Sequence, residues 1–206
     1  MKSVIESIIP VFLLTLCLQL QGADWNRFRG PNAKGVGSGK QLPVEYALEK
    51  AQWKISLENK GNSSPVISEG LLYLTFAKFD SETKRGNRIL SAYATTDGSL
   101  RWTKHWPFTM YKTNKRNGFA SASVCADANG VYVFWQAEDA SKLYGLDHSG
   151  EELWCYEVGK FGAGTGAATS PIVHQGVVLL SHDNEKYESF LLAVSAVDGK
   201  RKWQTV

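Results

Sequence analysis

Short apolar segments alternate with polar turns through most of the chain after residue 60. The most continuous of them, residues 70–76, 130–135 and 176–181, each begin with a glycine and show no strict alternation of apolar and polar positions. Segments rich in Val, Leu, Tyr and Phe predict β-strands, and an unbroken apolar run predicts a strand covered on both faces of its sheet. No window of helical length after the N-terminal apolar stretch has helical periodicity. The pattern therefore predicts an all-β fold.

The apolar segments belong to a unit that occurs three times. Before each glycine-opened strand lies a short strand led by serine or threonine, at residues 63–68, 121–126 and 169–174. After it lies a third strand that contains a small residue, which is Ala92, Gly145 or Ala193. A fourth strand then follows a polar turn. Four-stranded units that repeat in this way, with both sheet faces covered, are typical of the blades of a β-propeller.

The fourth strand of each unit carries a tryptophan, and a glycine precedes that tryptophan by four positions. The pairs are Gly98 and Trp102, Gly150 and Trp154, and Gly199 and Trp203. Glycine permits the positive φ that a tight turn between the third and fourth strands requires. A tryptophan ring on the outer strand can bury about 200 Å² against the neighbouring blade. We therefore expect these residues to dock one blade on the next.

The same repeat predicts where the blades lie. We expect three blades, at residues 61–106, 117–159 and 164–206, in a partial propeller over residues 51–206. A lone strand at 51–56 should carry Trp53 in the place of a fourth-strand tryptophan. Because complete propellers have about four to eight blades, the remaining blades are expected to be missing from this chain. Trp203, in the last unit, should then be more exposed than Trp102 and Trp154.

The fourth-strand motifs resemble the tryptophan-docking repeats of the pyrroloquinoline-quinone (PQQ) propellers, broadly Ala-x-Asp-x-x-x-Gly-x-x-x-Trp. The second copy keeps the aspartate of the motif as Asp147, with a turn one residue shorter, whereas Ala94 and Ser195 replace it in the other two copies. Residues 24–37 also resemble the opening of exported PQQ-like proteins from planctomycete-type bacteria. The resemblance implies a PQQ-like β-propeller and covers nearly all of the chain after the first 22 residues.

The N-terminal residues have the features of an export signal. Lys2 is followed by a mostly apolar run from Ile8 to Leu20. That run is shorter than the roughly 20 residues of a membrane-spanning helix, and no stop-transfer segment follows it. We expect a signal peptide at 1–22, an N-terminal extension at 23–50, and no transmembrane segment once the signal is removed. The protein should therefore be exported to the periplasm or the cell exterior.

Charge and cysteine content narrow the function further. The formal net charge of +3 is too small to indicate nucleic acid as a partner. Beyond the expected signal peptide, Cys125 and Cys155 remain, on the first and fourth strands of one unit, about 14 Å apart by strand spacing and too far for a disulfide. Both are expected to be buried single thiols. The four histidines lie in separate segments without metal-ligand spacing and are expected to be surface or loop-packing residues.

The PQQ-like family includes dehydrogenases, which need a calcium or lanthanide site, an aspartate base and a basic residue near the quinone, and which often have two adjacent cysteines. Acidic pairs here lack the spacing of a metal loop; they are Asp80 and Glu82, Glu138 and Asp139, and Asp183 and Glu185. We expect no catalytic, cofactor-binding or metal-binding residue, and interpret the chain as a non-catalytic binding or scaffold module of the cell envelope. The alternative is a fragment of a PQQ-dependent dehydrogenase whose PQQ and calcium site lies in the missing blades.

Two segments, 78–88 and 103–118, are expected to be long loops on one face of the propeller. They place cations beside aromatic rings, a combination that can hold an anionic polymer, a glycan or an acidic loop of a partner, and an envelope protein or glycan is the expected partner. The expected binding residues are Arg85, Lys112, Lys115, Arg116, Trp106 and Tyr111, and Arg88 is a further cation of the same segments. The alternative is that both segments are solvated loops whose charge keeps them soluble.

Overall fold

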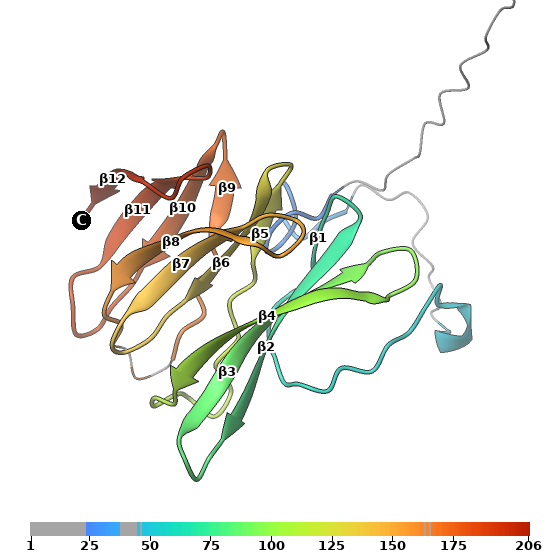
Figure 1. Cartoon of the computed structure of the whole chain (residues 1–206), viewed down its shortest axis with the longest axis horizontal. Helices are drawn as coiled ribbons and strands as arrows, with labels where there is room; N and C mark the ends of the chain where they lie inside the picture. Colours follow the sequence, from blue (N-terminus) through green and yellow to red (C-terminus); the bar gives the residue numbers. More distant parts are fainter. Residues whose placement is uncertain (1–23, 38–44, 46, 163, 165) are drawn as a thin grey trace, which may run out of the picture.

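The protein is described by a computed structural model that covers residues 24–37, 45, 47–162, 164 and 166–206. The signal peptide expected at 1–22 lies outside these residues. Apart from a short 3₁₀ helix, η1 (Leu48–Lys50), the described residues form β-strands and their connections (Figure 1). Among the described residues, no helix has the length and apolar character needed to cross a membrane.

Twelve strands form three four-stranded antiparallel sheets, which we call blades 1, 2 and 3. Blade 1 contains β1 (Val66–Ser68), β2 (Leu71–Asp80), β3 (Arg85–Ala94) and β4 (Leu100–Thr109). Blade 2 contains β5 (Cys125–Asp127), β6 (Gly130–Trp135), β7 (Ser141–Leu146) and β8 (Glu152–Gly159). Blade 3 contains β9 (Ile172–His174), β10 (Val177–His182), β11 (Phe190–Ser195) and β12 (Arg201–Thr205).

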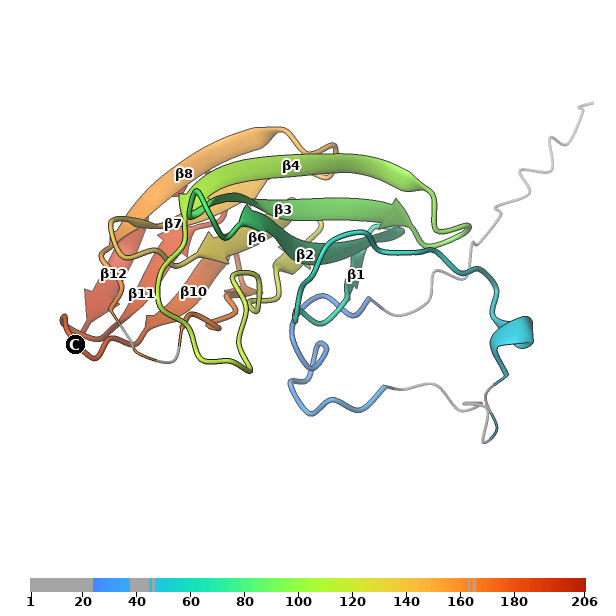
Figure 2. The same ribbon diagram turned by 90° about the horizontal axis from the view of Figure 1, so that it is seen from below.

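Each blade is a meander in which every strand pairs with the next strand of the chain. The three sheets share one register, because Val66, Cys125 and Ile172 occupy the same position opposite the second strand of their blades. In Figure 2 the outer strands β4 and β8 run along the upper edge of the molecule, and β2 and β6 lie beneath them. The prediction of an all-β partial propeller is therefore confirmed.

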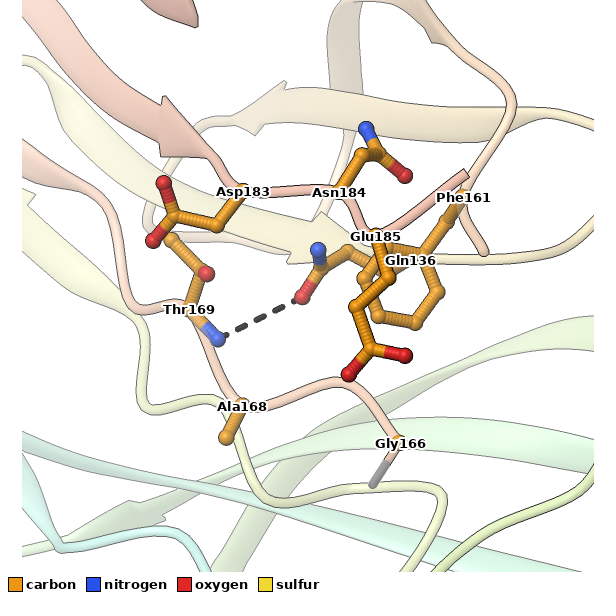
Figure 3. A pocket seen from close by; sticks show the side chains of 8 residues that line it. All are labelled: Gln136, Phe161, Gly166, Ala168, Thr169, Asp183, Asn184 and Glu185. Carbon is orange, nitrogen blue, oxygen red and sulfur yellow. Dashed lines mark hydrogen bonds between the residues drawn. The ribbon is translucent and has the colours of Figure 1, made fainter. Parts of the chain in front are cut away.

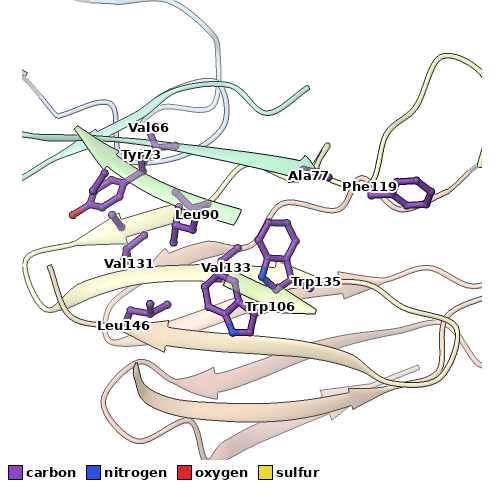
Figure 4. Packing of buried hydrophobic residues seen from close by; sticks show 14 residues of the cluster. Val66, Tyr73, Ala77, Leu90, Trp106, Phe119, Val131, Val133, Trp135 and Leu146 are labelled. Atoms are coloured by element: carbon purple, nitrogen blue, oxygen red, sulfur yellow. The ribbon is translucent and has the colours of Figure 1, made fainter. Parts of the chain in front are cut away.

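The hydrophobic core lies between neighbouring blades. One cluster joins blades 1 and 2, where Leu90 packs in the same core as Val131 and Val133 (Figure 4). A second cluster joins blades 2 and 3 and includes Phe134 and Leu192. Blade 2 has a neighbour on each side, and accordingly every residue of β6 is buried.

The expectation that β10 is covered on both faces is wrong. Its residues alternate between half-buried and buried, from Val177 to His182. Blade 3 packs against blade 2 on one face, and no described residue forms a further sheet against its other face. The apolar run of the sequence therefore marks a strand that has one covered face in this chain.

Of the two segments expected to be long loops, 78–88 is mostly strand, whereas 103–118 is strand to Thr109 and a loop, as expected, over 110–118. β2 continues to Asp80 and β3 begins at Arg85, so the connection between them is a short hairpin turn. β4 extends to Thr109. The ladder between β3 and β4 pairs Arg85 with Thr109 at this end of the blade. Backbone pairing thus orders residues whose polar composition had indicated loops.

The N-terminal residues pack against the inner strands. The carbonyl oxygen of Trp25 accepts the backbone N–H of Ile67 in blade 1 at 2.9 Å, and that of Asn26 accepts the N–H of Ala126 in blade 2 at 2.9 Å. Residues 51–56, expected to be a strand, have no strand ladder. A fourth-type strand needs a third strand of its own blade as partner, and no such strand precedes it among the described residues.

Candidate functional site: blade-docking contacts and clefts

Each turn glycine receives the tryptophan of the preceding blade. A Cβ added to Gly150 would lie 2.8 Å from the ring of Trp102, and one added to Gly199 would lie 2.7 Å from the ring of Trp154. Both glycines have positive φ, 91° and 66°. The sequence pointed to the turn conformation, but it did not show that the empty Cβ position is a seat for the indole of another blade.

The indole N–H fixes the same contact at its polar edge. Trp102 Nε1 donates to the carbonyl oxygen of His148 at 2.8 Å, and Trp154 Nε1 donates to that of Ala196 at 2.9 Å. Both acceptors lie in the turn that also carries the glycine seat. The ring is therefore held both by apolar contact and by one hydrogen bond, as buried tryptophans generally require.

Trp53 makes this contact without belonging to a strand. Its ring lies against Gly98, where an added Cβ would be 2.6 Å from the ring, and its Nε1 donates to the carbonyl oxygen of Thr95 at 2.8 Å. The segment 51–56 thus supplies blade 1 with the tryptophan that a preceding blade would supply in a longer array.

Small residues on the third strand make room for each tryptophan within its own blade. Ala92 pairs with Trp102, Gly145 with Trp154, and Ala193 with Trp203 across the third and fourth strands. A Cβ on Gly145 would overlap the Trp154 ring. The ring is thus packed between its own third strand and the turn of the next blade.

A serine at the start of each blade forms a second inter-blade link. The backbone N–H of Ser64 donates to Ser123 Oγ at 2.9 Å, and the backbone N–H of Ser123 donates to Ser170 Oγ at 2.9 Å. The strand registers place these three serines at equivalent positions, two residues before their first strands. The repeated Ser/Thr-rich segments were the sequence signal for this link, but its partner across the blades was not predicted.

The blade 1–blade 2 junction also contains a histidine. His148 Nδ1 is 2.6 Å from the hydroxyl of Tyr73, and its Nε2 is 2.8 Å from the carbonyl oxygen of Asp127. The carbonyl can only accept, so Nε2 carries the proton and Nδ1 accepts from Tyr73. Burial raises the pKa of Tyr73, which keeps its hydroxyl protonated. His148 is thus a packing residue that joins two blades.

The docking position of blade 3 is open. The side chain of Trp203 is 46% exposed, whereas Trp154 is 8% exposed and Trp102 is partly buried. No described residue supplies the glycine seat for Trp203. Further apolar side chains are exposed on this blade, among them Ile172, Leu191 and Val197. The blade thus carries the docking residues of an inner blade without a neighbour to receive them.

A polar cleft of about 430 Å³ lies between blades 2 and 3 (Figure 3). Its floor is tied together by the backbone N–H of Thr169, which donates to Gln136 Oε1 at 3.4 Å. The side chains of Asp183 and Glu185 face it, and Glu185 Oε2 also accepts the N–H of Gly164 at 3.1 Å. Within the described residues no group of three His, Cys, Asp or Glu side chains could hold a metal ion. The lining combines the carboxylates of Asp183 and Glu185 with the amide groups of Gln136 and Asn184.

The predicted cationic binding face is divided. Arg85, Lys112, Lys115 and Arg116 are exposed. Arg85 lines a cavity between blades 1 and 2, whereas Lys115 and Tyr111 line a different cleft beside β2. The structure thus does not gather the predicted residues around one pocket.

The prediction that Trp106 belongs to the binding face is wrong. Only 8% of its surface is exposed, and it belongs to the core between blades 1 and 2 (Figure 4). It was expected to lie in a loop, but it lies on β4, whose inward-facing side packs against blade 2. Its ring therefore cannot serve as a solvent-facing surface of a loop.

The two cysteines differ in environment. Cys125 on β5 is buried and Cys155 on β8 is exposed, so the expectation that both are buried is wrong for Cys155. Both are free thiols on the two opposite edge strands of one sheet, which the strand order keeps apart. Burial raises the pKa of the Cys125 thiol, which makes it a poor nucleophile.

Comparison with known proteins places the repeat in a family. A family model described as outer membrane protein assembly factor BamB matches residues 37–206. The quinohemoprotein alcohol dehydrogenase from Comamonas testosteroni is 19% identical over 89% of this chain and 27% of its own, with a TM-score of 0.56. A europium-containing methanol dehydrogenase is 14% identical over 71% of this chain and 25% of its own, with a TM-score of 0.49. No curated protein matches the chain.

At 19% identity the alcohol dehydrogenase shows similarity of fold alone. The chain spans about a quarter of the length of each. That proportion is consistent with a propeller that has further blades elsewhere.

Proposed function

Because the chain belongs to the PQQ-like repeat family described as outer membrane protein assembly factor BamB, we propose that it is a non-catalytic binding or scaffold module. Its binding surface is the open face of blade 3. The observation that carries the proposal is Trp203, which repeats the docking tryptophans of the inner blades and is 46% exposed.

The occupant of that face is a further blade of the same repeat type. The Trp203 ring would lie on the turn glycine of that blade, and its Nε1–H would donate to a carbonyl oxygen of the same turn, as Trp154 does at Ala196. The backbone N–H of Ser170 stands where Ser64 and Ser123 donate to the serine of the following blade. Exposed apolar area beside these groups would be buried in the same step.

We place the module in the envelope. The features of the first 22 residues support export to the periplasm or cell exterior, and the name of the matching family refers to outer membrane assembly. An envelope protein that presents PQQ-type blades is the expected partner, and an envelope glycan is the second. We expect neither PQQ nor calcium to bind to this chain alone.

Site-specific photo-crosslinking in the producing cell tests the proposal. A photo-reactive phenylalanine analogue replaces Trp203, and the control replaces His105, which is exposed on β4 of blade 1. Position 203 should crosslink to the turn of a PQQ-type repeat, identified by mass spectrometry of the joined peptides, and position 105 should not. Equal crosslinking at both positions, or crosslinks from position 203 to lipid or unrelated proteins only, would contradict the proposal.

The alternative is a fragment of a PQQ-dependent dehydrogenase. The fold similarity to a quinohemoprotein alcohol dehydrogenase supports this alternative. Incubation of the complex crosslinked through position 203 with PQQ and calcium separates the two hypotheses. The alternative puts the cofactor site in the missing blades, so only under the alternative should quinone absorbance stay with the complex through gel filtration. The scaffold proposal predicts that the absorbance elutes with the small molecules.

A further inference from the structure

A cavity of about 520 Å³ lies between β3 and β4 of blade 1 and β6 and β7 of blade 2. Arg88 and Trp106 line it from blade 1, and Trp135 and Tyr144 line it from blade 2. It is separate from the polar cleft of Figure 3 and from the docking face of blade 3.

Arg88 is a buried cation without an acidic partner. It is 3% exposed, and no described carboxylate forms an ion pair with it. Its Nε donates to the carbonyl oxygen of Phe119 at 3.1 Å, and its Nη2 donates to the hydroxyl of Tyr111 at 3.1 Å and to the carbonyl oxygen of Gln136. Nη1 has no hydrogen bond to a described residue. Guanidinium remains charged in proteins, so this charge is buried without a counter-ion.

Trp135 supplies a second donor in the same cavity wall. It is 4% exposed, and its buried Nε1 has no hydrogen-bond partner among the described residues. The Arg88 guanidinium carbon lies 5.5 Å from the centre of the Trp135 ring. A buried donor left unpaired costs about 1–3 kcal/mol. Trp135 Nε1 is thus a buried donor without an acceptor, and Arg88 Nη1 is a nearby donor that no described residue pairs.

The charged side chains around the cavity also favour an acceptor that carries negative charge. Its cations are Arg88, the partly buried Lys142 and the exposed Arg85, and the carboxylate among its lining residues is Asp139. Lys142 pairs with Trp135 across β6 and β7, which places it on the wall that carries the unpaired indole. The excess of positive charge favours an anion.

Aromatic side chains form part of the remaining lining. The Trp106 ring lies 5.8 Å from that of Trp135 and 5.1 Å from that of Tyr144. Figure 4 shows Trp106 and Trp135 beside each other at the junction of the two blades. Such surfaces pack well against a planar apolar body.

We propose that this cavity binds a small carboxylate with a planar apolar body. The carboxylate would accept from Arg88 Nη1 and the Trp135 indole, and the body would pack against Trp106 and Tyr144. This site is independent of the docking face, because it lies between blades that are already joined.

Binding of phenylacetate to the whole chain tests the inference, with phenylacetamide as the neutral control of the same shape. Titration is followed by the indole N–H resonances of ¹⁵N-labelled protein, and the Trp135 signal is assigned with a Trp135→Phe variant. We expect saturable binding of the acid that shifts the Trp135 signal, and binding of the amide at least about tenfold weaker because it lacks the charge.

Two substitutions locate the anion. Lys142→Ala should weaken phenylacetate binding about 3–10-fold while the fold persists, because the side chain of Lys142 makes no hydrogen bond to a described residue. Lys104→Ala, on the same pair of strands as Arg88 but outside the cavity, should leave binding unchanged. Arg88→Lys keeps a charge but loses the planar fork, and should weaken binding more than Lys142→Ala.

Three results would overturn the inference. They are absence of saturable binding at millimolar phenylacetate, equal binding of the acid and the amide, and equal affinity of the Lys142→Ala and Lys104→Ala variants. Each would mean that Arg88 serves only to join blades 1 and 2 through the carbonyl oxygens of Phe119 and Gln136.

Discussion

At the scale of single residues, the junction of blades 2 and 3 depends on the contact between Trp154 and Gly199. The ring occupies the space that a Cβ at position 199 would fill, and the indole N–H is paired with Ala196. Both parts of the contact depend on one turn, so a small change in that turn should affect the whole junction.

Alanine at two glycines separates docking from backbone strain. Gly199 and Gly176 both have positive φ, 66° and 75°, so alanine should cost about 1 kcal/mol of strain at either position. A Cβ on Gly199 would also meet the Trp154 ring, whereas a Cβ on Gly176 meets nothing within 4 Å. We therefore expect Gly199→Ala to lower the free energy of unfolding by clearly more than Gly176→Ala, measured by urea denaturation. Equal losses of unfolding free energy in the two variants would contradict the packing of the Trp154 ring on Gly199.

Removal of the rings themselves should follow their burial. Trp154→Ala deletes a buried ring and should cost about 3–5 kcal/mol. Trp203→Ala should cost clearly less, because its ring is 46% exposed and contacts no following blade in this chain. Denaturant unfolding of both variants measures the difference, and comparable losses at the two positions would contradict the docking role.

His182 makes stability depend on pH. It is 1% exposed, its Nε2 is 3.1 Å from the carbonyl oxygen of Lys160, and burial lowers its pKa below the ordinary 6.5. The unfolded chain therefore takes up a proton at His182 more readily than the folded chain does. The contribution of neutral His182 to the free energy of unfolding is complete above about pH 6.5, and it is lost as the pH falls through the folded-state pKa.

The variant His182→Gln should show a smaller loss of unfolding free energy between pH 7 and pH 5 than the parent chain. Identical pH profiles for His182→Gln and the parent would show that His182 does not titrate as its burial requires.

At the scale of elements, the position of a strand in its blade decides the reactivity of the cysteines. Cys125 lies on the inner strand β5, and Cys155 lies on the outer strand β8. In a Cys17→Ser chain, a thiol reagent should modify Cys155 in the native protein and Cys125 only after unfolding. Peptide mapping identifies the modified residue, and native modification of Cys125 would contradict the blade assignment.

The blades could be predicted from the sequence because the glycine–tryptophan pair occurs three times at similar spacing, so each copy supports the others. The sequence-based prediction was wrong where neighbouring segments, rather than the segment itself, determine the structure. β10 was predicted to be covered on both faces but has one open face. Trp106 was predicted to lie in a loop but is buried on β4. The contact at Gly199 could not be predicted from one repeat alone, because the Trp154 ring that packs on this glycine belongs to the preceding blade.

At the scale of the whole molecule, three blades form an array with unequal ends. Trp53 occupies the seat of blade 1, so that end is filled by the chain's own segment. At the other end, Trp203 and Ser170 repeat donors that are paired in the inner blades. Among the described residues, one docking position is thus filled and the other is exposed.

Hydrogen exchange at the indole N–H groups of the isolated chain tests most directly whether that docking position is built but unfilled. Nuclear magnetic resonance of ¹⁵N-labelled protein resolves these groups, and tryptophan-to-phenylalanine variants assign them. We predict slow exchange for Trp53, Trp102 and Trp154, whose Nε1 atoms donate to carbonyl oxygens of the next turn. Trp203 should exchange at the rate of a solvent-exposed indole, and exchange as slow as that of Trp154 would contradict the account.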